Sequence, residues 1–319
     1  MRTTSVVDEL GALAHRLAHP AQTHRGCAPP EVLADRPDGT VVRSGPVVAK
    51  AHAPDTDRAD LSARLALAAD PSMTGILLPP LGAPPGLAAG RRAVSLWPYG
   101  TPVDPADPAA APWTPAAQLL ARLHRTAPPF PLPPMRGPAK AARAVLRMRT
   151  ALPGTPPPVR PVLAAWRALP AWARGEAANP ATRAGFLCHG DLHLGQFVRH
   201  PAPAGPWLLI DVDDAGTGDP AWDLARPAAW YAAGVLPYED WLLFLDAYRA
   251  AGGPAVPADG DPWRALDVPA RALTVQTAAL ALAKCAAQER DPDELELLMI
   301  EACARIASLP PQLAAEDAT

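Results

Sequence analysis

Two aspartates, each beside a short apolar segment, constrain this chain more than any other feature. Residues 189–196 read HGDLHLGQ and lie between the apolar segments 186–188 and 197–198. Asp211 follows the apolar segment 207–210, fifteen residues after Gln196. The sequence therefore predicts a short β island whose strands deliver two carboxylates, Asp191 and Asp211, with one amide between them in sequence.

This set of side chains is typical of phosphoryl transfer. The reaction needs one carboxylate that accepts the proton of an attacking hydroxyl. It also needs a second carboxylate and an amide oxygen that hold Mg²⁺ against the nucleotide phosphates. Asp191 suits the first role, and Asp211 with Gln196 suits the second. We expect the two carboxylates to lie on opposite sides of one nucleotide–magnesium complex.

The same residues carry a resemblance to a known family. Residues 189–191, the downstream amide, Asp211 and the segment 218–225 (GDPAWDLA) resemble motifs of aminoglycoside phosphotransferases and choline-kinase-like enzymes. The resemblance implies that Asp191 is the catalytic base, that Asp211 binds metal, and that ATP or GTP is used with Mg²⁺. It also implies that segment 218–225 orders the loop that follows it. Supporting roles are expected for His189, His193, Asp213, Asp219 and Asp223.

One position departs from the pattern of this family. The family usually has asparagine where this chain has Gln196, and the sequence HGDLHLGQ is similar to the catalytic loop of bacterial maltokinases. Glutamine still offers a carbonyl oxygen, on a longer side chain, so it remains able to bind the metal. The acceptor therefore stays open between an aminoglycoside-like or other antibiotic and a sugar or amino-sugar.

The first hundred residues predict a small β-rich lobe. Apolar segments and turn signals predict strands over 31–34, 40–43 and 47–52, with the hairpin signal Asp38-Gly39 before the second of them. Two further strands are expected over 76–78 and 93–97. Helices are expected over 5–19, where apolar residues recur at helical spacing, and over 57–69, which opens with acidic residues.

Lys50 is the candidate phosphate-binding residue of this lobe. In kinase-like folds a strand-borne lysine contacts the α- and β-phosphates and is held by a helix glutamate. Segment 48–50 resembles that strand, and Lys50 is the only lysine in the first 130 residues. Helix 57–69 contains no glutamate. Asp57 and Asp60 are its available carboxylates, and Asp60 is the expected partner of Lys50. No glycine-rich loop is present, and the turn at Asp38-Gly39 is expected to serve in its place.

Residues 95–100 (SLWPYG) resemble the hinge of kinase-like folds, where backbone groups meet the nucleotide base. The hinge residues expected to do so are Leu96, Trp97 and Pro98, and Trp97 is expected in the core. After residue 112 nearly every segment outside the β island predicts a helix. The expected helices are 115–125, 138–151, 158–174, 220–233, 238–251, 263–288 and 293–308.

The expected fold class is α+β, a protein-kinase-like two-lobed fold. Residues 1–98 form the nucleotide-binding β-rich lobe, and residues 99–319 form the helical lobe with the catalytic loop and the acceptor site. The acceptor site is expected near carboxylates and aromatic side chains of the helical lobe. These are Asp213, Asp214, Trp222, Trp230, Tyr231, Glu239 and Asp240, several of which also suit helix starts or core positions.

The bulk composition excludes several classes of protein. Apolar residues make up 49% of the 319 residues and charged residues 19%, which is typical of a globular chain. The net charge of −3 gives no reason to expect nucleic acid or membrane partners. No secretory signal or membrane-spanning segment is recognised, so a cytoplasmic location is expected. The oligomeric state stays open between monomer and homodimer.

The four cysteines lie far apart without a CxxC pair, so we expect free buried thiols rather than a zinc site or disulfides. Two other functions of the aspartate motif were weighed. A haloacid-dehalogenase-like phosphatase would need strand–helix units after Asp211, where helices are predicted. An EF-hand loop would need glutamate at its twelfth position, which is Trp222. A non-catalytic nucleotide-binding protein on the same fold remains the alternative to an enzyme.

Overall fold

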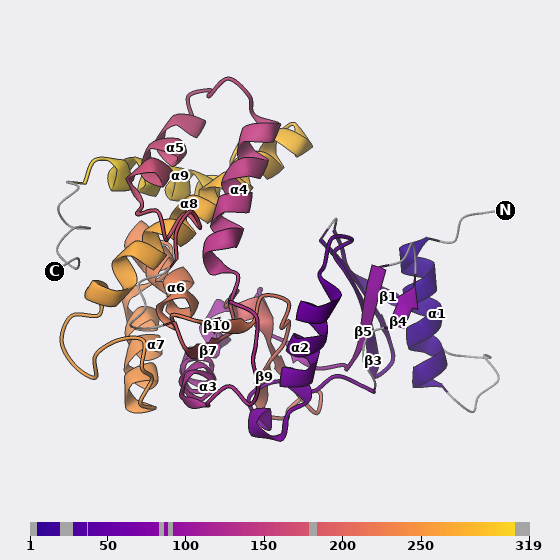
Figure 1. Ribbon diagram of the computed structural model, residues 1–319. Helices are drawn as coiled ribbons and strands as arrows, with labels where there is room; N and C mark the ends of the chain where they lie inside the picture. Colours follow the sequence, from indigo (N-terminus) through magenta and orange to yellow (C-terminus); the bar gives the residue numbers. More distant parts are fainter. Residues whose placement is uncertain are drawn as a thin grey trace. The chain divides into compact units, whose positions relative to one another are not determined.

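The computed structural model describes residues 5–19, 28–36, 38–82, 86–88, 92–178 and 184–309 (Figure 1). The chain divides into two compact units. The first unit comprises Met1–Ala111, Pro129–Pro133 and Leu194–Asp213. The second unit comprises Pro112–Pro128, Pro134–His193 and Asp214–Thr319. The chain therefore passes from one unit to the other within the catalytic-loop motif, and it returns between two consecutive aspartates.

The first unit contains a five-stranded antiparallel sheet with the order β1-β2-β3-β5-β4. Its strands are β1 (Glu31–Arg36), β2 (Gly39–Ser44), β3 (Val47–His52), β4 (Gly86–Ala88) and β5 (Arg92–Pro98). Strands β1, β2 and β3 follow one another along the chain and pair antiparallel in that order, as the apolar segments and turn signals predict. The strand predictions for 31–34, 40–43, 47–52 and 93–97 are confirmed.

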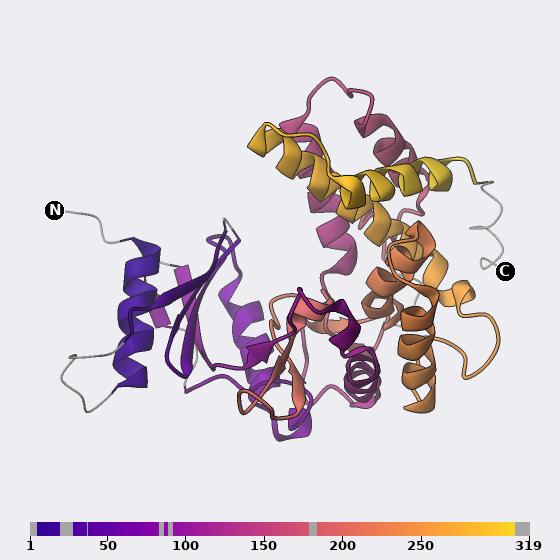
Figure 2. The ribbon, with the colours of Figure 1, turned by 180° about the vertical axis from the view of Figure 1, so that it is seen from behind.

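Helix α1 (Val6–Ala18) packs against this sheet (Figure 2). Ser5 and Asp8 form a capping box, in which each side chain bonds the backbone of the other, and this fixes the start of the helix. The apolar face of α1 brings Leu10 and Ala14 onto Val42 and Ala49 of the sheet. Burying these side chains supplies the main stabilisation of this lobe.

Residues 76–78 do not form the predicted strand. Leu77 makes a single parallel bridge to Leu209, and the Leu78 N–H donates to the Leu209 carbonyl at 2.9 Å. A 3₁₀ helix, η1 (Pro71–Met73), precedes this segment, and Pro79 and Pro80 follow it. Because proline cannot donate a ladder hydrogen bond, no regular strand extends through this segment.

The predicted β island is divided between the two units. In the first unit, β6 (Thr101–Pro102), β8 (Phe197–Arg199) and β9 (Trp207–Leu209) form a three-stranded sheet in the order β6-β8-β9. In the second unit, β7 (Phe186–Cys188) pairs with β10 (Gly216–Gly218). The two candidate aspartates therefore belong to different units, Asp211 to the first and Asp191 to the second.

The second unit is mainly helical. Its helices are α3 (Trp113–Arg125), α4 (Gly137–Ala151), α5 (Val159–Ala168), α6 (Ala221–Ala233), α7 (Tyr238–Ala250), α8 (Trp263–Gln288) and α9 (Glu294–Ala307). The long helix α8 packs against α4, α6 and α9, while α3 packs against α7 and α5 against α9. The helix predicted over 158–174 ends at Ala168, because Pro170 disfavours the helical conformation at Leu169, which is extended.

Cys188, Cys285 and Cys303 are free and buried, as expected, and Cys27 lies outside the described residues. None of the helices in the described part of the chain is both long enough and apolar enough to span a lipid bilayer.

Candidate active site

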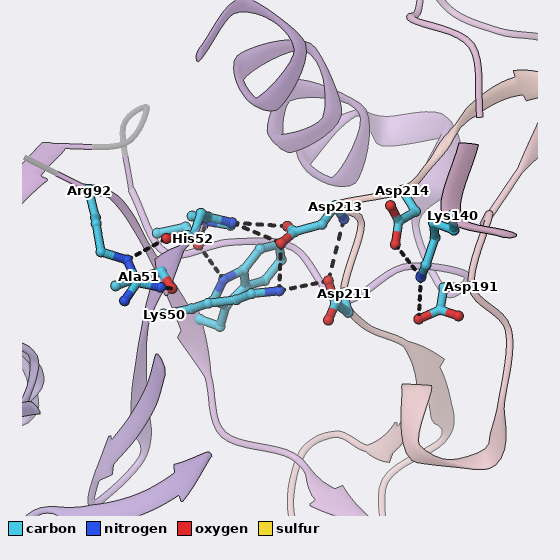
Figure 3. Close-up of polar contacts among 11 residues, drawn as sticks. Lys50, Ala51, His52, Arg92, Lys140, Asp191, Asp211, Asp213 and Asp214 are labelled. Carbon is cyan, nitrogen blue, oxygen red and sulfur yellow. Dashed lines mark hydrogen bonds and ion pairs between the residues drawn. The ribbon is translucent and has the colours of Figure 1, made fainter. Parts of the chain in front are cut away.

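Lys50 lies in the first unit between two carboxylates that sequence analysis had assigned to other roles. Its Nζ is 2.7 Å from Asp211 Oδ1 and 3.0 Å from Asp213 Oδ2 (Figure 3). Burial alone would lower the pKa of Lys50, but the two aspartates outweigh burial and hold the pKa above its ordinary value. Lys50 is therefore a fixed positive charge next to the candidate metal ligand. We call Lys50, Asp211, Asp213 and His52 the Lys50 cluster.

His52 supports this cluster from two positions further along β3. Its Nδ1 lies 3.1 Å from Asp213 Oδ2, and its Nε2 lies 2.7 Å from the Ser95 hydroxyl. The His52 side chain has no solvent exposure. The Trp97 indole N–H donates to the same Ser95 hydroxyl at 2.8 Å. A buried network thus connects Asp213 to β5 and restrains its carboxylate.

Asp60 does not pair with Lys50. Its carboxylate lies 3.5 Å from Arg64 Nη1, one turn further along helix α2 (Arg58–Ala69). Asp57 caps the N-terminus of the same helix by accepting from the Asp60 N–H at 3.0 Å. The prediction of a helix-borne carboxylate for Lys50 is therefore wrong, because the loop carboxylates Asp211 and Asp213 already contact the ammonium.

Gln196 and Asp211 are close along the β8–β9 ladder of the first unit. The Ile210 N–H donates to the Gln196 carbonyl at 2.9 Å, and Phe197 pairs with Leu209. Gln196 is buried, and Asp211 has φ 63°, a left-handed conformation that aspartate tolerates better than most residues. Amide and carboxylate oxygens are the hard donors that Mg²⁺ prefers. This donor set fits the expected metal, which would screen the phosphate charge of a bound nucleotide.

The turn expected to act as the nucleotide loop lies beside Lys50. Gly39 pairs with His52 across the β2–β3 ladder, and a Cβ placed at Gly39 would approach Lys50 Cε to 4.0 Å. Gly39 therefore lies within van der Waals reach of the Lys50 side chain.

The expected hinge residues end strand β5. Trp97 is buried, as expected, and Leu96 pairs with Ala49 of β3. The Leu96 carbonyl accepts from the Leu81 N–H at 2.7 Å, and Pro98 has no N–H to offer. Their contact with a nucleotide base stays a prediction.

Asp191 lies in the second unit between two cations. Lys140 Nζ is 2.7 Å from Asp191 Oδ2 (Figure 3). Arg226 Nη2 is 2.7 Å from Asp191 Oδ1. Lys140 also contacts Asp214 Oδ2 at 2.7 Å. Burial would raise the pKa of Asp191, but Lys140 and Arg226 outweigh burial and hold the pKa well below its ordinary value. We call Asp191, Lys140, Asp214 and Arg226 the Asp191 cluster.

A buried network fixes the loop that carries Asp191. The Asp223 carboxylate accepts from the His189 N–H at 2.6 Å and from the Gly190 N–H at 2.7 Å. Gly190 has φ 81°, and a Cβ there would collide with the Asp214 carbonyl oxygen. Only glycine therefore fits between the two aspartates of the Asp191 cluster. Asp219 accepts from the Ala221 N–H at 3.0 Å and stabilises the start of α6.

His124 and Tyr248 extend this network. His124 Nε2 lies 3.0 Å from Asp223 Oδ2, and His124 Nδ1 lies 2.7 Å from the Tyr248 hydroxyl. That hydroxyl accepts from the Ala255 N–H at 3.0 Å, so its own proton is available to His124 Nδ1. Cys188 also offers its sulfur near His124 and Asp223. Burial, with Asp223 and Asp219, raises the pKa of this thiol, which favours its protonated form.

His193 stands in the same loop with a neutral ring. Its pKa is lowered to about 4, mainly by burial; the nearby Arg226 guanidinium acts in the same direction and Asp191 opposes the change. A neutral imidazole adds no positive charge at physiological pH, so Lys140 and Arg226 supply the cations next to Asp191.

The candidate acceptor residues have structural surroundings of their own. Trp222 is buried and meets Trp172 edge to face, with ring centroids 6.4 Å apart. Tyr231 stacks on Trp241 at 5.6 Å and is half-buried, like Trp230. Glu239 and Asp240 lie in the first turn of α7, where carboxylates suit the helix dipole. A role of these residues in acceptor binding stays a prediction.

Sequence analysis missed five residues of these networks: His52, His124, Lys140, Arg226 and Tyr248. Lys140 carried a signal, because the chain has only three lysines, Lys50, Lys140 and Lys284, among 29 basic residues. Arg226 carried another, since it directly follows the motif 218–225 and lies one helical turn after Asp223.

Three comparisons with known proteins complete this description. A family model described as phosphotransferase enzyme family matches residues 41–266. The search of curated proteins gave no match. Among solved structures, a choline/ethanolamine kinase family protein from Mesorhizobium loti is 18% identical, with TM-score 0.53 over 96% of this chain and 98% of that one.

Two further structures are similar. Choline kinase LicA from Streptococcus pneumoniae is 13% identical, with TM-score 0.54 over 93% of this chain and 98% of that one. A thermostable mutant of aminoglycoside phosphotransferase APH(4)-Ia, in ternary complex with AMP-PNP and hygromycin B, is 14% identical. Its TM-score is 0.56 over 92% of this chain and 97% of that one. The predicted resemblance and the α+β, protein-kinase-like fold are confirmed.

Proposed function

We propose that this chain, which belongs to the phosphotransferase enzyme family, transfers the γ-phosphoryl group of ATP to a hydroxyl group of a small molecule. The observation that carries the proposal is the pairing of each motif aspartate with a lysine, Asp211 with Lys50 and Asp191 with Lys140. Fixed cations beside both carboxylates suit a reaction whose transition state spreads negative charge over phosphoryl oxygens.

The Lys50 cluster is proposed to bind the nucleotide. Lys50 would contact the phosphates next to the turn at Gly39, and backbone groups of Leu96–Pro98 would meet the base. Asp211 and Gln196 would hold Mg²⁺, which neutralises phosphate charge when bound. His52 holds Asp213 in place, so Lys50 would keep one carboxylate partner if Asp211 bound a metal. GTP is the alternative donor.

Asp191 is proposed to accept the proton of the acceptor hydroxyl. The hydroxyl oxygen forms the new bond to the γ-phosphorus, the bond from that phosphorus to the bridging oxygen breaks, and ADP leaves. The proton passes to Asp191. Lys140 and Arg226 each bond a different oxygen of Asp191, and this fixes the direction in which the carboxylate faces the hydroxyl. Joint action of Asp191 and Asp211 on one nucleotide stays a prediction.

The acceptor is proposed to be an antibiotic, for which an aminoglycoside-like molecule is one candidate, or a sugar. The catalytic loop, with Gln196 in place of asparagine, favours a sugar kinase of the maltokinase type as the second candidate. A role in antibiotic resistance depends on the first of these. Use of ATP is consistent with the cytoplasmic location that the sequence predicts.

A coupled assay of ADP release tests this function. Wild-type protein with ATP, Mg²⁺ and a panel of hydroxyl acceptors is expected to release ADP and to stop when EDTA removes the metal. Asp191→Asn is expected to lower kcat by at least about a hundredfold, because the proton acceptor is lost. Asp246→Asn, on the exposed face of α7, is the matched control. Wild-type kcat in Asp191→Asn would contradict the assignment of Asp191 as the proton acceptor. No Mg²⁺-dependent turnover in the wild type would instead favour a non-catalytic nucleotide-binding protein.

A further inference from the structure

The charges of this chain are strongly segregated along its length. No aspartate or glutamate occurs from residue 108 to residue 175, although ten arginines and lysines lie there, and the whole chain has 32 acidic residues. Helices α3, α4 and α5 of the second unit fall within this segment. The positive charge therefore gathers in this one segment of the chain, in a protein whose net charge is −3.

Four of these cations form one stripe at α4. Arg136, Lys140, Arg143 and Arg147 follow one another at intervals of four, three and four residues. At 3.6 residues per turn they fall within about 60° of the helix circumference and extend over roughly 16 Å. The side of the helix that packs inward is made of small and apolar residues such as Ala141 and Met148. We call the four cations the α4 stripe.

The α4 stripe starts at the Asp191 cluster. Lys140 contacts both Asp191 and Asp214 at 2.7 Å (Figure 3). The backbone N–H of Arg136 donates to the Asp214 carbonyl at 3.2 Å. Further along the helix, Arg143 and Arg147 are exposed. Within the described residues, no carboxylate pairs with either of them. The positive charge thus continues outward from the carboxylate that would receive the acceptor's proton.

The positive charges of the α4 stripe are unfavourable for the stability of helix α4 itself. Like charges three or four residues apart repel, and cations near a helix N-terminus oppose the helix dipole. The first turn of α4 has no acidic residue to offset them. Lys140 is balanced by two aspartates, whereas Arg143 and Arg147 are not. An anionic ligand would supply the charge that the described part of α4 lacks.

We propose that the acceptor hydroxyl belongs to an anionic molecule, one bearing phosphate or carboxylate groups that the α4 stripe binds. The proposal rests on the phosphotransferase function and specifies its substrate class. Arg143 and Arg147 are specificity-determining residues in this view, since they would contact the anionic groups of the acceptor while its hydroxyl meets Asp191. A polycationic acceptor such as an aminoglycoside would be repelled by the same stripe.

Four forms of one sugar test the proposal, because they share hydroxyl groups and differ in charge. Glucose 6-phosphate, glucuronate, glucose and glucosamine are titrated into the wild-type protein by calorimetry and supplied in the ADP-release assay. The phosphate and carboxylate forms are expected to bind at least about tenfold more tightly than glucose and glucosamine. Comparison of the first two identifies which anionic group the stripe prefers.

The double variant Arg143→Gln/Arg147→Gln removes the two unpaired cations and keeps good helix formers. Its thermal midpoint is expected at or above the wild-type value, since repulsion is removed, so lost binding would not reflect unfolding. Affinity for the anionic sugars is expected to fall about tenfold, and the effect is expected in KM rather than kcat. Arg264→Gln/Arg305→Gln, with the same change in charge on exposed positions of α8 and α9, is the matched control.

Three results would overturn the proposal. These are glucosamine or glucose binding as tightly as the anionic forms, no binding of either anionic form, and equal loss of affinity in the two double variants. The phosphotransferase function fails in a different way. A wild-type protein that binds the anionic sugars with this preference, yet never releases ADP with Mg²⁺ and any acceptor, would leave the anion site intact and disprove the reaction.

Discussion

At the scale of single residues, the His193 side chain is expected to make the stability of the folded protein depend on pH. Its pKa in the folded protein is about 4, below the ordinary 6.5, mainly because burial disfavours the imidazolium. Between pH 6.5 and pH 4 the unfolded chain therefore binds one proton more than the folded protein. Stability is expected to fall as the pH drops through this window, by at most about 3 kcal/mol, and to lose nothing more from this group below pH 4.

The variant His193→Gln tests this by urea unfolding at pH 7 and at pH 4.5. It is expected to lose less stability between the two conditions than the wild type, because glutamine does not titrate. The same exchange at His200, a half-buried histidine of the first unit, is the control. Identical losses in wild type and His193→Gln would show that the His193 ring is not buried in its neutral form.

Residue identity predicted the centre of each cluster but not its surroundings. The motifs pointed to Asp191, Asp211 and Lys50, because catalysis restricts which side chains can stand there. Asp60 was expected to pair with Lys50 by analogy with kinase-like helices. The structure instead places the loop carboxylates of Asp211 and Asp213 against the Lys50 ammonium. The contact of Lys140 with Asp191 joins positions 51 residues apart. Such a contact depends on how the helices pack, which local sequence does not encode.

At the scale of secondary-structure elements, Tyr248 connects α7 to α3 and to the catalytic loop. Its hydroxyl accepts from the Ala255 N–H and bonds His124, which in turn bonds Asp223. Tyr248→Phe would leave the Ala255 N–H and His124 Nδ1 without this partner in a fully buried place. We expect a loss of about 1–3 kcal/mol in the free energy of unfolding, measured by chemical denaturation.

The same variant is also expected to lower kcat, since Asp223 holds the backbone of His189 and Gly190 next to Asp191. Tyr238→Phe is the matched control, because Tyr238 is 55% exposed on the same helix. An unchanged unfolding free energy in Tyr248→Phe would mean that the network does not support the loop.

Most element boundaries followed from periodicity, and the failures have a common cause. Pro170 ended α5 six residues before the predicted end, and Pro79 and Pro80 directly follow the segment 76–78, where a strand was expected. The predicted ranges for these two segments gave proline little weight, in a chain that has 43 prolines. Proline still disfavoured regular helix and strand structure near these two segments. The division of the β island between two units could not be read from sequence, since each short strand there finds its partner far along the chain.

At the scale of the whole molecule, the two units are expected to contribute separable functions. Binding of ATP with Mg²⁺ stabilises a folded protein by about 2.7 kcal/mol when the ligand is at a hundred times its Kd. Asp191→Asn is expected to keep this rise in thermal midpoint, because the Lys50 cluster lies in the other unit. Asp211→Asn is expected to lose most of it, because the charged metal ligand is removed.

Asparagine is the appropriate replacement at position 211, where φ is 63°, because it adopts this left-handed conformation more readily than alanine. ATP with EDTA in place of Mg²⁺ serves as the control for metal-dependent binding. An equal rise in the thermal midpoint of both variants would contradict the assignment of Asp211 to the metal.

The scarcity of lysine has a practical consequence for chemical labelling. Acylating reagents attack only a neutral amine, and the ion pairs of Lys50 and Lys140 raise their pKa and keep both amines protonated. Lys284 is exposed and is the third and last lysine of the chain. A succinimidyl ester dye is therefore expected to attach at Lys284 and the terminal amine, which would allow the protein to be immobilised without blocking either aspartate.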